Sequence, residues 1–142
     1  MSKKKKTIIG AVCLVVVIAL AFGGKYLYDF QRYRNIIAGI EIRTPDISLI
    51  HDGTYNGTFD AIFVGADVSV TVIDNRITEI IINEHKNDRG PTAEVITDDV
   101  IVQQSLEVDT ISGATNSSRV ILKAIENALE SALESRIEQG VR

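Results

Sequence analysis

Residues 68–83 read VSVTVIDNRITEIIIN, and the central strands of the predicted sheet follow from this pattern. Valines alternate with small polar residues over positions 68–72, and this period of two predicts a strand with one buried face. Asp74-Asn75 then interrupts the pattern, and both residue types tolerate the left-handed backbone of a tight hairpin turn. The apolar pattern resumes over residues 77–83, so the stretch predicts two antiparallel strands joined by a hairpin.

The sequence on either side of this hairpin adds further elements. Residues 54–64 carry three aromatic residues on one side and predict an earlier strand, so that three consecutive strands form an antiparallel meander. Gly90-Pro91 marks a break in the chain, and proline is well suited to the first turn of a helix. Residues 92–104 therefore predict a short helix after the sheet.

The C-terminal segment predicts a long amphipathic helix that begins near Asn116. Its apolar stripe consists of Val120, Ile121, Ala124, Ile125, Ala128, Leu129, Ala132 and Leu133. The opposite face, which we expect to be solvated, carries Glu126, Glu130, Glu134 and Glu138. A helix of this kind covers one face of a sheet, so the sequence predicts an α+β fold: an antiparallel sheet covered by a long C-terminal helix.

The N-terminal segment, residues 1–24, predicts a transmembrane anchor. Four lysines at positions 3–6 precede a run without charged side chains, residues 7–24. A helix of this length rises about 27 Å, close to the roughly 30 Å thickness of a bilayer core. Lysines before the span favour a cytoplasmic N-terminus and an extracytoplasmic C-terminal domain. A cleaved signal peptide is the alternative, because residues 19–21 resemble a cleavage site, and it would also export the domain.

The predicted division of the chain is an anchor over residues 1–24, a juxtamembrane stalk and linker over residues 25–45, and a globular domain over residues 46–142. After Gly24 the chain has 11 basic and 19 acidic residues, a net charge of −8. Such a domain is repelled by phosphate backbones, which argues against nucleic-acid binding. The single cysteine, Cys13, excludes an internal disulfide, and we expect neither a metal site nor a catalytic nucleophile–base pair.

Residues 107–118 read EVDTISGATNSS and place small and hydroxyl residues directly before the predicted C-terminal helix. The first N–H groups of a helix lack internal partners, and the helix dipole adds positive charge there, so this position suits a phosphate. Gly113 would let the backbone approach a ligand closely. Ordinary helix capping explains the same residue types, and physics alone leaves both interpretations open.

Residues 109–115, DTISGAT, resemble the flavinylation motif of the FMN-binding domain family. This family includes the covalent-flavin subunits of sodium-pumping NADH:quinone reductase and of ion-pumping ferredoxin:NAD oxidoreductase. The resemblance runs from about Asp52 to Leu129: residues 52–57 (DGTYNG) resemble the opening strand, and residues 84–90 (EHKNDRG) resemble the central loop. The one departure is the hairpin turn, where the family more often has Asp-Gly.

The resemblance implies that a flavin transferase attaches FMN through its phosphate to Thr115, within an FMN-binding domain over residues 46–142. The residues that it assigns to the cofactor and its attachment are Asp109, Ser112, Gly113, Ala114, Thr115 and Asn116. Thr110, Ser117 and Ser118 are neighbouring hydroxyl residues that we expect to stay unmodified, the serines acting as caps.

The leading functional hypothesis is an electron carrier, not an enzyme, that exchanges electrons with membrane redox partners while the N-terminal helix lies in the lipid bilayer. The alternative is a non-covalent FMN-binding or scaffold module of a larger membrane redox complex. An oxidoreductase with its own organic substrate is a third class, but relatives of that kind carry an extra catalytic domain. His85 is expected to be a solvated residue at a strand end, with a flavin contact as the alternative.

Overall fold

The computed structural model describes residues 2–87 and 91–140 of the chain. The chain divides into two compact units, Met1–Asn35 and Ile36–Arg142. The predicted division into anchor, stalk and domain stays a prediction. Of the central loop singled out in the sequence, residues 88–90 lie outside the described residues.

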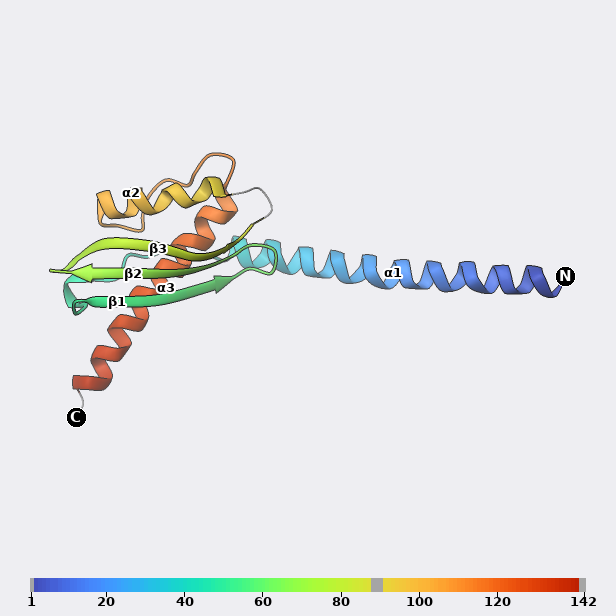
Figure 1. Ribbon diagram of the computed structural model, residues 1–142, viewed down its shortest axis with the longest axis horizontal. Coiled ribbons are helices and arrows are strands. Elements are labelled where there is room, and N and C mark those ends of the chain that lie inside the picture. Colours follow the sequence, from blue (N-terminus) through green and yellow to red (C-terminus); the bar gives the residue numbers. More distant parts are fainter. Residues whose placement is uncertain (1, 88–90, 141–142) are drawn as a thin grey trace. The chain divides into compact units, whose positions relative to one another are not determined.

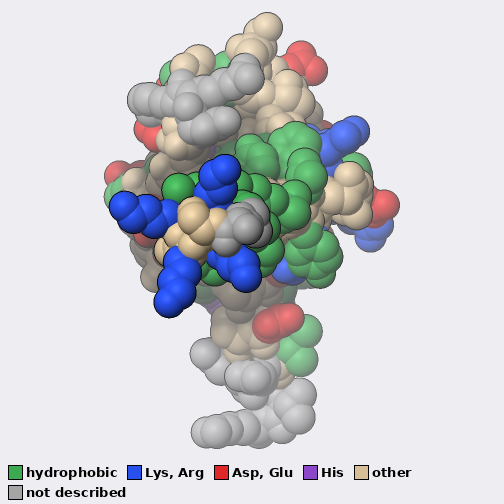
Figure 2. Space-filling view, turned by 90° about the vertical axis from the view of Figure 1, so that its right-hand side faces the viewer, with side chains coloured by type: hydrophobic (Ala, Val, Ile, Leu, Met, Phe, Trp, Pro, Cys, Tyr) green, Lys and Arg blue, Asp and Glu red, His purple; other side chains and the backbone are tan. Residues whose placement is uncertain are grey.

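Helix α1, Lys3–Ala38, accounts for nearly all of the first unit. Among the described residues it is the one helix long and apolar enough to cross a membrane, and none of its most apolar window is buried. Figure 2 looks at its N-terminal end, where basic side chains gather around apolar ones. The predicted apolar N-terminal helix is confirmed, whereas its orientation and the question of cleavage remain at the level of prediction.

The second unit is built on a sheet of three antiparallel strands in the order β1-β2-β3: β1 is Gly53–Asp60, β2 is Gly65–Ile73 and β3 is Arg76–Lys86. Asp74 and Asn75 form the β2–β3 turn with φ angles of 51° and 61°, the left-handed pair that a two-residue hairpin requires. The predicted meander is therefore confirmed.

The first strand is shorter than the sequence predicted, because the chain turns after Asp60. The Asp60 carboxylate accepts a hydrogen bond from the backbone N–H of Ile62 at 2.7 Å, and Ile62 has a positive φ of 71°. Phe63 consequently lies in the turn instead of extending the aromatic side of β1. A local side-chain bond of this kind competes with the ladder and ends the strand.

Helix α3, Thr115–Gly140, covers one face of the sheet and crosses β1 and β2 (Figure 1). Val68, Val70 and Val72 of β2 are fully buried beneath it. Gly57 of β1 makes the closest approach: an added Cβ would overlap the carbonyl oxygen of Ala124 and lie 2.8 Å from Cα of Ala128. The predicted α+β fold is confirmed, and small residues let this helix lie directly on the strand.

Between the sheet and α3, the chain forms a 3-10 helix, η2 (Pro91–Val95), and the short helix α2 (Ile96–Gln103), instead of one helix over residues 92–104. Gln104 ends α2 in the left-handed conformation. Its side-chain amide accepts from the N–H of Ile77 and donates to the carbonyl of Ile77, each at 2.8 Å. This residue therefore ties the end of α2 to strand β3.

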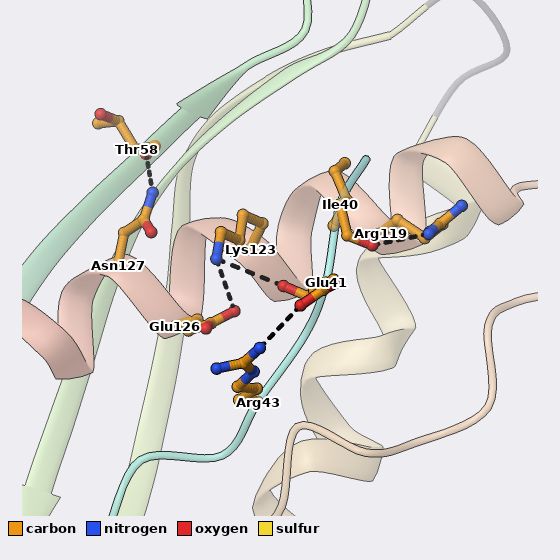
Figure 3. A network of polar contacts seen from close by, with 8 residues as sticks. All are labelled: Ile40, Glu41, Arg43, Thr58, Arg119, Lys123, Glu126 and Asn127. Atoms are coloured by element: carbon orange, nitrogen blue, oxygen red, sulfur yellow. Dashed lines mark hydrogen bonds and ion pairs between the residues drawn. The ribbon is translucent and has the colours of Figure 1, made fainter. Parts of the chain in front are cut away.

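The segment that follows α1 lies against the first half of α3, before the single-turn helix η1 (Ile47–Leu49) (Figure 3). Arg119 donates to the carbonyl of Ile40 at 2.8 Å, and Lys123 reaches the carbonyl of Glu41 at 3.4 Å. Glu126, which the sequence placed on the solvated face, is 2% exposed and pairs with Lys123 at 3.1 Å. The prediction for Glu126 is wrong because a distant segment covers that face.

Candidate functional site

The loop between α2 and α3 carries the motif that the sequence singled out, and its two ends are anchored. At the first end, Leu106 is 1% exposed, and its backbone N–H donates to the Thr44 hydroxyl at 2.9 Å. The Thr44 and Ser105 hydroxyls also lie 3.2 Å apart. The residues just before the motif are therefore held by the buried Leu106 side chain and by hydrogen bonds to the linker that precedes η1.

The centre of the loop is a tight turn immediately before α3. The backbone N–H of Ala114 donates to the carbonyl of Ile111 at 2.9 Å, which closes the turn over Ser112 and Gly113. Gly113 has a φ of 78°, in the region that favours glycine. A Cβ built on Gly113 would meet nothing within 4 Å, so this turn faces open space. The arrangement leaves the backbone approachable from outside.

Ser118 stabilises this turn through two hydrogen bonds of its side chain. Its side chain is fully buried, and its hydroxyl donates to the carbonyl of Ala114 at 2.9 Å while accepting from the N–H of Ile111 at 3.0 Å. The sequence anticipated a helix cap at this serine, and the hydroxyl does serve the backbone. Its bonds extend further than a cap, because they join the first turn of α3 to both ends of the Ser112-Gly113 turn.

Thr115 is the first residue of α3, and its side chain is exposed. The N–H groups of a first helical turn have no carbonyl one turn earlier, and a 26-residue helix adds positive potential at this end. A hydroxyl at this position can therefore carry a phosphate where backbone donors and the dipole favour negative charge.

The structure brings the residues predicted for the cofactor together on one short surface segment. Those with exposed side chains or backbone are Asp109, Ser112, Gly113, Thr115 and Asn116. Ala114 is half-buried, and so is Ser117, one of the expected unmodified hydroxyls, in the first turn of α3. Thr110 is exposed and precedes the turn.

A second polar feature lies at the end of β3, where the structure corrects the solvated position expected for His85. The His85 side chain is 2% exposed, and its Nδ1 lies 3.0 Å from Oε1 of Glu94 in η2. Its Nε2 is buried and has no hydrogen-bond partner among the described residues. Glu94 therefore joins the end of β3 to η2, and η2 in turn packs against α3.

Sequence reasoning missed Glu94, because no local pattern indicates that it fixes the His85 ring across the Gly90-Pro91 break. A third feature is a hollow of about 200 Å³ at one end of the sheet. Its lining residues are Thr58, Phe59, Asp60, Gly65, Ala66, Asp67, Glu84 and Lys86. The six residues predicted for the cofactor do not line this hollow, so it does not define their site.

Comparison with protein families identifies the domain. Residues 65–130 match the model of the FMN-binding domain, a segment that runs from β2 through the motif to the middle of α3. This part of the chain belongs to the FMN-binding domain family, and FMN is its cofactor. Comparisons with curated proteins and with solved structures found no match.

The residues present suit this cofactor. Thr115 offers an exposed hydroxyl at a helix N-terminus, Gly113 leaves space beside it, and the Ser118 bonds hold the turn in shape. The unpartnered Nε2 of His85 is a further buried polar atom with unused hydrogen-bonding capacity. When bound, FMN supplies an isoalloxazine ring with redox chemistry of its own, and the protein supplies its binding and orientation.

Proposed function

We propose that this protein is a membrane-anchored electron carrier whose FMN is linked through its phosphate to Thr115. One observation carries the proposal: Thr115 is exposed as the first residue of α3, directly after an open turn that Ser118 fastens. The FMN-binding family of residues 65–130 and the apolar helix α1 support the cofactor and the anchor.

The attachment reaction requires a nucleophilic oxygen and an accessible loop. In the proposed step, the Thr115 hydroxyl oxygen forms a bond to the FMN phosphorus of FAD, and the pyrophosphate bond breaks so that AMP leaves. The hydroxyl proton passes to a base of the flavin transferase. Asp109, Ser112, Gly113 and Ala114 present the surface that this transferase recognises, and residues 112–116 then surround the phosphate. Neighbouring backbone N–H groups stabilise the charge that remains on it.

Electron transfer between proteins is the role that suits a flavin attached at an exposed loop. Three of the recognition residues are exposed, so a flavin on Thr115 is accessible from outside the domain. Redox partners in or on the same membrane would exchange electrons with it. The main alternative is a module that binds FMN without a covalent bond, or a scaffold of a larger redox complex.

Intact mass tests the attachment directly. The full chain is co-expressed with a flavin transferase, and the wild type should gain one FMN phosphoester. Thr115→Val removes the hydroxyl with little change in shape and should abolish the gain. Thr110→Val is the matched control, because Thr110 is an exposed threonine of the same loop, and it should load normally. FMN mapped to Thr110, Ser117 or Ser118, or an unloaded wild type, contradicts the proposal.

Denaturing gel fluorescence separates the covalent carrier from the non-covalent alternative, because only a covalently attached flavin stays with the denatured chain. The proposed orientation places residues after α1 outside the cytoplasm, since four lysines precede the span. Protease added to intact protoplasts should then degrade the FMN-binding domain. Full protection of the domain would overturn the orientation while leaving the attachment intact.

A further inference from the structure

The part of α1 that follows its apolar run presents a continuous aromatic face. Tyr26 and Phe30 stack with ring centroids 6.4 Å apart, and Phe30 and Tyr33 follow at 6.3 Å. Tyr26 and Phe30 are nevertheless 61% and 41% exposed. These residues lie four and then three positions apart, which is the spacing of the core positions d, a and d of a coiled-coil heptad.

The same register continues into the apolar run with residues of a different size. Gly23 occupies the preceding a position and Ala19 the preceding d position. Two small residues four positions apart on one face let transmembrane helices approach closely. The heptad register thus places small side chains within the apolar run, where a second helix could pack in lipid. It places aromatic side chains just after this run.

The charged residues beside this face are complementary in the same register. Asp29 falls at position g and Arg34 at position e, five residues later. In a parallel coiled coil, a g residue of one helix faces the e residue of the next heptad on its partner. Asp29 also pairs with Lys25 of its own helix at 2.7 Å, and this pair orders the carboxylate beside the aromatic face.

We propose that two copies of this chain pair in parallel through α1, with Ala19, Gly23, Tyr26 and Phe30 at the contact. A single anchor inserts every copy in the same direction, so only a parallel pair can form, and this is the pairing in which Asp29 meets Arg34 of the second copy. The consequence is that two FMN-binding domains are held on one pair of anchors. Each then has a permanent neighbour at a high effective concentration.

Cysteine cross-linking of the full chain in lipid vesicles tests this pairing. Cys13 is first replaced by serine, and a single cysteine is then placed by Tyr26→Cys or Phe30→Cys. Core positions of a parallel pair lie close enough for a disulfide, which needs Cα atoms about 4.4–6.8 Å apart. Oxidation should therefore give a disulfide dimer as the main product from both variants.

Tyr28→Cys is the matched control. Tyr28 is an aromatic residue of the same helix with 64% exposure, but it falls at position f, on the side away from the contact. It should cross-link at least tenfold more slowly than Phe30→Cys. Equal rates at positions 28 and 30, or no dimer from Tyr26→Cys and Phe30→Cys, would overturn the proposal and indicate that the aromatic face contacts lipid instead.

A charge exchange provides the second test, which varies only the charged residues beside the aromatic face. In the Tyr26→Cys background, Asp29→Lys should lower the dimer yield several-fold, because it brings like charges together across the pair. Adding Arg34→Glu should restore the yield by recreating the pair with exchanged signs. A yield that falls further with the second substitution contradicts the assigned register.

Discussion

Around Ala124 and Ala128, helix α3 lies so close to β1 that Gly57 has no room for a Cβ, whereas around Thr115 the same helix begins in open surface. The middle of α3 buries a stripe of apolar side chains, among them Ala124, Ala128 and Leu129. Its first turn is joined to the preceding loop by the two hydrogen bonds of one buried hydroxyl, Ser118. One helix therefore separates two tasks: its middle stabilises the domain, and its first turn presents the reactive hydroxyl.

The largest effect on stability is expected from Gly57→Ala. The added Cβ overlaps backbone atoms of α3, which cannot rotate away, so the cost should exceed the about 1–3 kcal/mol of ordinary overpacking. Urea unfolding of the separately expressed unit Ile36–Arg142, followed by circular dichroism, measures it. Gly53→Ala is the control, because the atoms nearest to a Cβ there all belong to the end of the Tyr55 side chain, with its hydroxyl oxygen at 3.2 Å, and none of them is backbone. An equal decrease in the free energy of unfolding from both substitutions would show that the close approach of α3 to Gly57 does not raise the cost.

A second large effect is expected from Leu129→Ala. The Leu129 side chain is fully buried on the sheet-facing stripe of α3, and its truncation should cost roughly 2–5 kcal/mol. The same urea titration provides the measurement. Val102→Ala, at a position that is 80% exposed, should change the free energy of unfolding by less than about 0.5 kcal/mol. A loss at Leu129 within that margin would mean that the stripe is not the core.

An intermediate effect is expected from Ser118→Ala, which removes the two side-chain hydrogen bonds between the helix and its loop. The half-buried Ile111 loses the acceptor of its N–H, and the loss should approach the lower end of the about 1–3 kcal/mol that an unpartnered buried donor costs. Thr115 keeps its hydroxyl, so the variant should still acquire FMN by intact mass. Ser117→Ala, the neighbouring control, should leave both stability and loading unchanged. An unchanged free energy of unfolding for Ser118→Ala would show that the turn does not depend on these hydrogen bonds.

The smallest effect on stability, and the largest on chemistry, is expected from Thr115→Val. The exposed side chain contributes little packing, so the free energy of unfolding should stay within about 0.5 kcal/mol of the wild-type value. FMN loading should fall to zero for want of an acceptor oxygen. If the variant loses FMN only because it unfolds, the beginning of α3 is needed for stability as much as its middle. The urea titration distinguishes this outcome from a loss of loading in a folded domain.

Local patterns sufficed for much of the fold because they depend on residues close together in the chain. The alternation over residues 68–72 and the left-handed preferences of Asp74-Asn75 predicted the hairpin, and the apolar stripe predicted which side of α3 packs on the sheet. The motif over residues 109–115 predicted the FMN family through a resemblance. The same reasoning failed at Asp60, whose carboxylate ends β1 early through a bond to its own turn.

The strands, the long C-terminal helix, the apolar N-terminal helix and the loop that carries the motif could all be predicted from the sequence. The surroundings of individual polar side chains became known only from the packing of segments that are distant in the chain. Glu126 is buried because the linker near Glu41 lies over α3, and His85 is buried because Glu94 returns to it from η2. The burial of a side chain depends on which distant segments of the chain pack against it. The hydrophobic periodicity of a single helix or strand does not contain that information.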